Sequence, residues 1–165
     1  MFTLLDGRRV VIRPVQPQDR PLFAEGIRLL STISSYRRFL SVRKGFSDEE
    51  LHYLTEVDGH DHVAIGAVTT DGQGAGVGRY IRDKADPGLA EWAIVLLDSF
   101  QRQGLGLELA RHLIDSARAG GITELHGWAS PENEAIQRML RKLGPLVVER
   151  GDGSFAGLLH LRTAL

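Results

Sequence analysis

A glycine-rich turn leads into a strongly patterned helix in the middle of the chain. The segment 101–106 reads QRQGLG. Small or apolar residues then recur at the helical positions i, i+3, i+4, i+7, i+8 and i+11, namely Gly106, Leu109, Ala110, Leu113, Ile114 and Ala117. This spacing predicts a helix over 104–119 with one buried face, closed by Gly120 and Gly121. Because a strand pattern over 89–97 precedes the turn, the local order is strand, turn and helix.

The turn itself has the composition of an anion-binding site. The first N–H groups of a helix lack internal hydrogen-bond partners and carry partial positive charge. Gly104 and Gly106 would let a ligand approach that backbone closely, and Arg102 adds a formal charge. We therefore predict a diphosphate site, with a plain tight turn as the alternative. No Lys-Ser/Thr pair follows the glycines, as a nucleoside-triphosphate P-loop requires, and Leu109 stands where a dinucleotide fingerprint needs a third glycine.

Strand and helix patterns alternate along the rest of the chain. Apolar runs bounded by turn residues predict seven strands, over 8–15, 62–70, 76–83, 89–97, 122–130, 146–150 and 155–163. Helical periodicity predicts four further helices, over 17–30, 34–40, 47–57 and 131–143. Ser47 with Glu50 forms a capping box, and Ser130 with Pro131 is expected to start the last helix. This order predicts an α/β fold with a mixed, mostly antiparallel sheet of six to seven strands and helices on both faces.

Composition limits the classes of partner. The chain has 165 residues, of which 42% are hydrophobic and 25% charged, so one globular domain over 1–165 is expected. The formal net charge of −1 predicts no general attraction to nucleic acid or to a membrane surface. The N-terminus lacks the pattern of a signal peptide, and no apolar run approaches the roughly 18 residues that span a bilayer. The absence of cysteine excludes disulfides and a cysteine nucleophile, and it suits the cytoplasm.

The turn and its surroundings resemble the Gcn5-related N-acetyltransferase (GNAT) superfamily. The resemblance is carried by the loop QRQGLG, the opener IRPVQPQD, the run AEWAIVLL and the block PENEAIQRMLRKLG, and it covers nearly the whole chain. The stretches YRRFLSVRKGFSDEELHYLTEVD and GVGRYIRD are similar to bacterial Pat-type protein-lysine acetyltransferases. The resemblance implies the GNAT fold and acetyl-CoA as cofactor. Relatives of this type often carry an added domain, for which this chain leaves no room, so control by a ligand bound in cis is not expected.

The resemblance also implies a set of cofactor-binding residues. In the family, backbone amides of the loop bind the CoA diphosphate, and the matching loop is Gln101, Arg102, Gln103, Gly104, Leu105, Gly106 and Leu107. The pantetheine arm pairs with the edge of the central strand, which matches Ile94, Val95 and Leu96. A family asparagine near the pantetheine matches Asn133, for which an ordinary polar residue in the first helical turn is the alternative.

Glu91 is the candidate catalytic base. Acetyl transfer to an amine requires that an ammonium lose its proton and that the thioester oxygen meet a hydrogen-bond donor. Glu91 is the only ionisable side chain in 89–97, where apolar neighbours would make it a better proton acceptor. It shares a strand face with Val95, and Pat-type enzymes have a catalytic glutamate at the matching position. The alternative is a structural glutamate paired with Arg79 or Arg82. By resemblance, a backbone N–H near Val95 is the expected oxyanion donor.

One position departs from the family pattern. Many members have a tyrosine seven residues after the asparagine as general acid, whereas this chain has Leu140. Tyr80 and Tyr36 are the nearest alternatives, and both are interpreted as packing residues. No general acid is assigned, but a CoA thiol can leave unassisted, so activity is still expected.

Other polar and aromatic groups are interpreted as structural. No metal is expected at the loop cluster His60, Asp61 and His62. A solvated helix face explains the basic cluster Arg37, Arg38, Arg43 and Lys44. Core or sheet packing explains Trp92 and Trp128.

The expected function is an acetyl-CoA-dependent N-acetyltransferase that acetylates protein lysine by direct attack of the amine in a ternary complex. The alternatives are a small amine or a protein N-terminus as acceptor, or a catalytically silent acyl-CoA-sensing module. The acceptor site is expected in the segment 34–54, and an acyl-CoA synthetase is one candidate acceptor.

Overall fold

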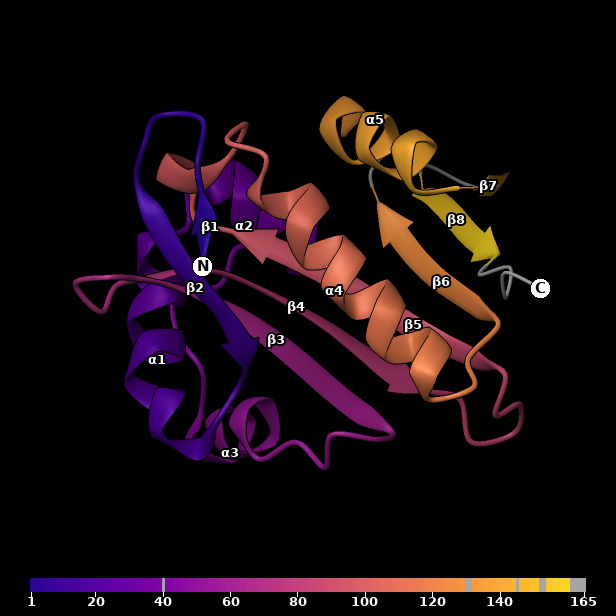
Figure 1. Cartoon of the computed structure of the whole chain (residues 1–165), viewed down its shortest axis with the longest axis horizontal. Helices are drawn as coiled ribbons and strands as arrows, with labels where there is room; N and C mark the ends of the chain where they lie inside the picture. Colours follow the sequence, from indigo (N-terminus) through magenta and orange to yellow (C-terminus); the bar gives the residue numbers. More distant parts are fainter. Residues whose placement is uncertain (40, 130–131, 145, 152–153, 161–165) are drawn as a thin grey trace.

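One mixed sheet organises the molecule. The computed structural model describes residues 1–39, 41–129, 132–144, 146–151 and 154–160, the last two ranges as backbone. In these ranges eight strands lie in the order β1-β2-β3-β4-β5-β6-β8-β7 (Figure 1). They are β1 (Phe2–Thr3), β2 (Arg9–Pro14), β3 (His62–Thr69), β4 (Gly74–Arg82), β5 (Leu89–Leu96), β6 (Glu124–Ala129), β7 (Leu146–Gly151) and β8 (Ser154–His160). The predicted mixed, mostly antiparallel sheet is confirmed, with the two-residue edge strand β1 as the addition.

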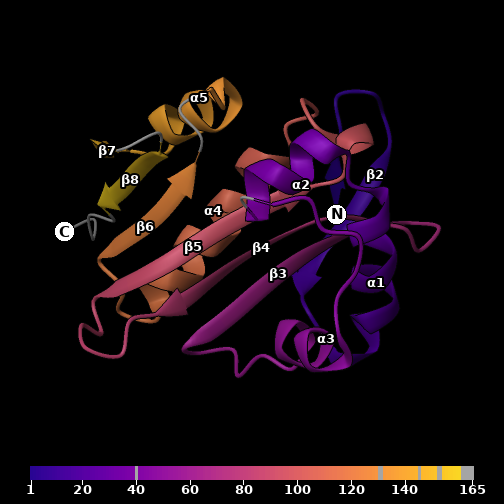
Figure 2. The ribbon, with the colours of Figure 1, turned by 180° about the vertical axis from the view of Figure 1, so that it is seen from behind.

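Helices cover both faces of the sheet, as predicted. They are α1 (Arg20–Leu29), α2 (Thr32–Phe39), α3 (Asp48–Thr55), α4 (Leu105–Ala119) and α5 (Glu134–Leu143). The helix α4 crosses one face, while α1 and α3 lie over the other face and α2 lies beside β5 (Figures 1 and 2). No helix in the described ranges is long and apolar enough to cross a bilayer.

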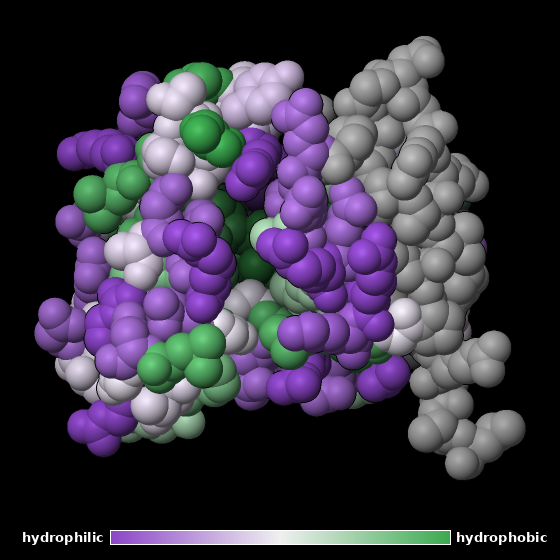
Figure 3. All heavy atoms as spheres, turned by 90° about the horizontal axis from the view of Figure 1, so that it is seen from above, coloured by the Kyte–Doolittle hydropathy of each residue, from purple (hydrophilic) through white to green (hydrophobic). Residues whose placement is uncertain are grey.

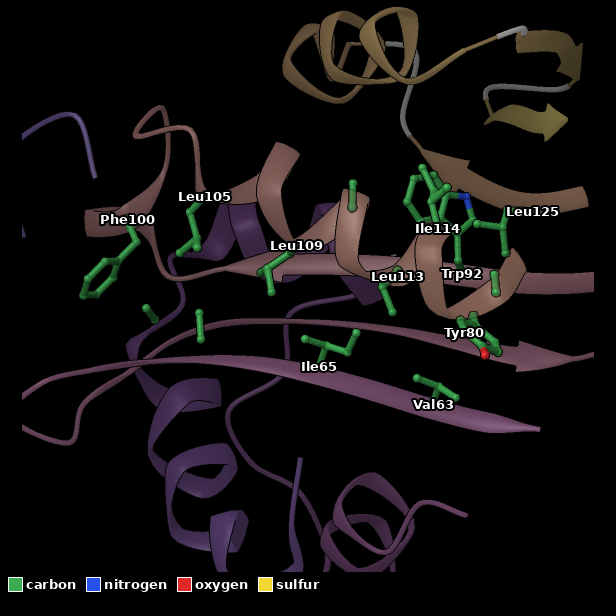
Figure 4. Close-up of a cluster of buried hydrophobic side chains, with 14 of the residues drawn as sticks. Val63, Ile65, Tyr80, Trp92, Phe100, Leu105, Leu109, Leu113, Ile114 and Leu125 are labelled. Atoms are coloured by element: carbon green, nitrogen blue, oxygen red, sulfur yellow. The ribbon is translucent and has the colours of Figure 1, made fainter. Parts of the chain in front are cut away.

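The core forms where the apolar stripe of α4 meets the sheet. Leu105, Leu109 and Leu113 are fully buried and point towards the strands, and Tyr80 is buried in the same core (Figure 4). Burying each of these leucines contributes about 1.5–3 kcal/mol. The Tyr80 hydroxyl lies 3.4 Å from the Ser116 hydroxyl of α4, which gives this buried polar group a partner. The periodicity that predicted α4 is therefore confirmed by its burial.

Two strands separate near the middle of the sheet. The parallel pairing of β5 with β6 covers only Leu89↔Glu124, Ala90↔Leu125 and Glu91↔His126. Beyond that point both strands continue but no longer pair with each other, and Figure 1 shows them diverging towards the end at which α4 begins. The edge of β5 after Glu91 is therefore left without a strand partner on the β6 side.

The helix ends agree with the sequence at α3 and differ at α5. Ser47 and Glu50 form the predicted capping box, with the Glu50 N–H donating to the Ser47 hydroxyl over 3.2 Å. The last helix begins at Glu134 with Asn133 as its N-cap, three residues later than predicted. The expected cap residues Ser130 and Pro131 lie outside the described residues. An Asn side chain competes well for the cap, which explains the later start.

Candidate active site

The glycine-rich turn lies directly at the start of α4. Two residues adopt left-handed backbone conformations, Arg102 with φ 58° and Gly104 with φ 84°. Gly104 is the N-cap of α4, and no side chain caps this helix end. The first N–H groups of the helix therefore have no side-chain acceptor, as a bound anion requires. We call residues 101–107 the anion loop.

Two glutamine side chains hold the anion loop in place. Gln101 Nε2 donates to the Ser34 hydroxyl of α2 over 3.0 Å and to the Leu96 carbonyl of β5 over 3.3 Å. Gln103 Oε1 accepts from the Asp6 N–H over 3.0 Å. These contacts fix the anion loop relative to α2, β5 and the segment that precedes β2. The exposed side chain of Arg102 remains available for a charge contact.

The packing around Gly106 does not require a glycine. A Cβ at this position would lie 3.5 Å from Leu96 Cδ1 and from Met139 Sδ, which are ordinary contact distances. An alanine is therefore compatible with the protein interior here. This supports close approach of a ligand, and not packing, as the reason for a glycine at this position.

The edge of β5 offers backbone groups to the gap beside β6. The Leu97 N–H donates to the Ala75 carbonyl of β4 over 3.0 Å. Because hydrogen-bonding direction alternates along an antiparallel strand, the N–H of Val95 also points to β4, whereas those of Ile94 and Leu96 point to the gap. The predicted oxyanion donor near Val95 therefore becomes the N–H of Ile94 or Leu96. The Leu96 carbonyl is already taken by Gln101.

A cavity of about 110 Å³ lies between the sheet and the helices α1 and α2. Its apolar walls include Leu22, Phe23, Ile27, Phe39, Val77, Ala93 and Val95. Two cations, Arg38 and Arg79, also line it. Viewed from the end at which α4 begins, the surface is hollowed, with a hydrophobic floor between hydrophilic walls (Figure 3).

Glu91 lies on the cavity's face of β5, two residues before Ala93. The expectation that apolar neighbours enclose Glu91 is wrong, since its side chain is exposed. Neither arginine considered as its partner pairs with it, because Arg82 binds Asp61 and Arg79 binds His62 and the Leu54 carbonyl. Its electrostatic neighbour is Arg38: burial lowers the pKa of Arg38, and the Glu91 carboxylate opposes that shift.

Arg38 and His126 lie near Glu91, and the sequence interpretation missed both placements. Arg38 lines the cavity and does not belong to a solvated face. The helical period places it with the buried Ser34 and Ser35, but such small polar residues do not mark a buried face from sequence. His126 is paired with Glu91 across the strands, and its ring centroid lies 4.9 Å from that of Trp128.

The two tryptophans have different environments. Trp92 is 6% exposed and packs in the core, as predicted. Trp128 is 56% exposed, so it is not a core residue, and its ring packs against that of His126 on the sheet. It lies on β6, two residues after His126 and on the same strand face. An exposed aromatic ring therefore lies beside His126, the ladder partner of the candidate base.

Residues of the last helix and the tyrosines take structural positions. Asn133 Oδ1 accepts from the Ile136 N–H over 3.3 Å, so the described contact of Asn133 is helix capping, and its cofactor contact stays a prediction. Leu140 is buried. Tyr80 is buried as predicted, whereas Tyr36 is exposed on α2 and does not pack.

The histidine and aspartate cluster before β3 is occupied by internal contacts. His60 Nδ1 lies 2.7 Å from Asp61 Oδ1, and Asp61 also accepts from Arg82. His62 Nε2 lies 2.9 Å from Arg79 Nη1. Over the described residues, no group of three or more His, Cys, Asp or Glu side chains is arranged to hold a metal ion.

Known proteins share the fold of this chain and part of its sequence. The family model of the acetyltransferase (GNAT) domain matches residues 9–145. An acetyltransferase of Pseudomonas aeruginosa is 34% identical over 161 residues, covering 96% of this chain and 86% of that protein. The acetyltransferase Pat of Mycolicibacterium smegmatis is 32% identical over 154 residues, covering 89% of this chain and 44% of that protein. The crystal structure of the GNAT domain of S. lividans PAT superposes with a TM-score of 0.88 at 25% identity, covering 97% of this chain and 95% of that chain.

Proposed function

Because the chain belongs to the GNAT family of acetyltransferases, which use acetyl-CoA, we propose that it acetylates lysine side chains of proteins by direct attack of the amine. The observation that carries the proposal is the position of Glu91, at the point where β5 and β6 separate and on the face of the apolar cavity. We also propose that residues 1–165 form one GNAT domain and that the reaction is cytoplasmic.

The anion loop and the free edge of β5 are suited to the two ends of the cofactor. The uncapped N–H groups of Leu105, Gly106 and Leu107 would bind the diphosphate, helped by the Arg102 charge. The gap-facing backbone groups of Ile94 and Leu96 would pair with the amides of the pantetheine arm. Since the gap narrows at the Glu91↔His126 pair, this arrangement directs the thioester towards Glu91.

Glu91 would supply the base for the reaction. Acetyl-CoA provides an activated acetyl group as a thioester. Glu91 takes one proton from the lysine ammonium, directly or through a water, so that the nitrogen lone pair can form the new C–N bond. The N–H of Ile94 or Leu96 stabilises the charge on the carbonyl oxygen. The C–S bond then breaks, the CoA thiolate leaves, and the second proton of the nitrogen passes to the thiolate or to water. With no cysteine in the chain, no cysteine thioester intermediate is available.

The open surroundings of Glu91 favour a macromolecular acceptor. Small-molecule sites usually enclose 70–90% of the surface of their ligand. Glu91 is exposed and Trp128 is 56% exposed, so these two residues do not form an enclosed site. A lysine side chain on a protein can reach such an open site while the rest of its protein stays outside. This favours protein lysine over a free amine as acceptor.

A CoA-release screen tests the proposal. Purified protein is incubated with acetyl-CoA and candidate acceptor proteins, including acyl-CoA synthetases, and modified residues are mapped by mass spectrometry. The proposal predicts CoA release coupled to acetylation of lysine Nζ. Acetylation confined to small amines or protein N-termini would contradict the protein-lysine assignment. A chain that binds acetyl-CoA but turns over none of these acceptors would instead fit the sensing module.

A further inference from the structure

Two arginines line the otherwise apolar cavity beneath α1 and α2. Arg38 comes from α2 and Arg79 from β4, and both face walls built from side chains such as Phe39 and Val95. A cation in such surroundings is costly unless an anion or several hydrogen bonds compensate it. The cavity is also lined by Asp19, but this carboxylate is held by Arg13 over 2.7 and 2.8 Å.

Arg79 is held by neutral partners. It is 6% exposed, donates to the Leu54 carbonyl over 3.1 Å, and lies 2.9 Å from His62 Nε2. Burial lowers the pKa of His62, which favours the neutral ring that can accept this bond. Burial, with a contribution from Arg38, lowers the pKa of Arg79 to about 10, so its guanidinium is still charged at neutral pH. The two arginines thus repel each other across the cavity.

Arg38 differs from the other arginines on this side of the molecule. Arg43 pairs with Glu50 over 2.5 Å, and Arg20 pairs with Glu56 over 2.5 Å. Arg38 lies over the Phe39 ring at 4.9 Å and, within the part of the chain that the structure describes, makes no ion pair or hydrogen bond. Glu91 attracts it electrostatically from beyond ion-pair distance. Its guanidinium donors therefore stay free to bind an incoming group.

We propose that Arg38, supported by the charge of Arg79, binds a carboxylate that the acceptor carries close to its reacting amine. The planar guanidinium matches a carboxylate through two parallel hydrogen bonds. The cavity reaches Ala93, which follows Glu91 on the same face of β5 at roughly 7 Å. An amine at Glu91 and a carboxylate at Arg38 would therefore lie on the same side of β5, which suits groups on neighbouring side chains, so the favoured acceptor is a lysine beside an aspartate or glutamate. This inference rests on the proposed acetyl transfer.

Matched acceptors and matched variants test this assignment. One pair of peptides differs only by Asp or Asn next to the lysine, and a second pair compares free lysine with the diamine that lacks its carboxylate. Each is assayed with wild type, Arg38→Gln and Arg37→Gln, whose exposed arginine lies on the same helix. We expect wild type to prefer the carboxylate-bearing member by about tenfold or more in kcat/KM. In Arg38→Gln that preference should disappear because KM for the carboxylate-bearing member rises. Arg37→Gln should keep the preference.

Binding of the peptides to the CoA-bound protein is measured by calorimetry in parallel, because this arm does not depend on turnover. A preference in the peptide pair supports an acidic protein segment as the source of the carboxylate, and a preference in the free-lysine pair alone supports an amino acid. Equal binding of both members in both pairs overturns the proposal while leaving acetyl transfer intact. If Arg38→Gln lowers kcat/KM equally for both members of each acceptor pair, the proposal is also overturned, since Arg38 would then act through Glu91.

Discussion

Glu91 and His126 form the last pair of the parallel ladder between β5 and β6, and their side chains lie on the same face of the sheet. Ladder partners share a face because successive side chains alternate along each strand. Trp128 follows on that face, two residues after His126. A carboxylate, an imidazole and an exposed aromatic ring thus lie on one face of the sheet where β5 and β6 separate, beside the backbone edge proposed for the cofactor.

Replacing Trp128 by alanine should weaken acceptor binding. A cation over an exposed aromatic ring gains about 0.5–1 kcal/mol, so KM for a lysine peptide should rise about two- to fivefold with kcat nearly unchanged. Steady-state kinetics with saturating acetyl-CoA measure this. Trp128→Phe should retain most of the affinity. An unchanged KM in Trp128→Ala would remove the ring from the acceptor site.

The two glycines of the anion loop should respond differently to alanine. Gly104 has φ 84°, so Gly104→Ala should lower the free energy of unfolding by about 1–2 kcal/mol. Gly106 lies within the first turn of α4 and has room for a methyl group, so Gly106→Ala should be at least as stable as wild type. The same methyl group would contact Leu96 and Met139, next to the edge of β5 proposed for the pantetheine arm, and acetyl-CoA should bind more weakly. Calorimetry and denaturant titration measure both quantities. A Gly106→Ala variant with wild-type affinity would contradict the placement of the cofactor beside this part of β5.

The sequence predicted those features that depend on local pattern. The helix α4 and the Ser47–Glu50 cap follow from residues within a few positions of each other, and both are confirmed. The neighbours of Glu91 depend on contacts between distant segments. His126 reaches Glu91 through a parallel pairing across a long connection, and Arg38 reaches the cavity through the packing of α2 on β5. No local pattern encodes these contacts, and none shows that β6 separates from β5 after Glu91. The Glu91 side chain is therefore exposed although its neighbours along the chain are apolar.

The pair formed by Asp19 and Arg13 should make stability depend on pH. Hydrogen bonds from Arg13, and then from the Gln16 N–H, hold the pKa of Asp19 below its ordinary value. A lowered carboxyl pKa contributes stability that is complete above the unfolded value of about 3.9 and is lost as pH falls through the folded value. Asp19→Asn should therefore be about 1.5–3 kcal/mol less stable than wild type at pH 7.

The difference between wild type and Asp19→Asn should shrink as pH falls below about 4. Urea unfolding at pH 7, 5, 4 and 3 measures it, and Asp115→Asn provides the control, because Asp115 is exposed and lies 3.9 Å from Arg118. A difference that stays constant over this range would show that the charge of Asp19 does not stabilise the fold.

The role of Glu91 is tested most directly by Glu91→Gln, which keeps the shape of the side chain and removes its basicity. Acetyl-CoA affinity by calorimetry should stay within about twofold of wild type, while single-turnover acetyl transfer to a lysine peptide at pH 7–8 should fall about 10²–10⁴-fold. Glu25→Gln, at an exposed carboxylate of α1 outside the expected acceptor segment, should transfer at the wild-type rate. If Glu91→Gln binds acetyl-CoA and also transfers acetyl at the wild-type rate, Glu91 is not the base.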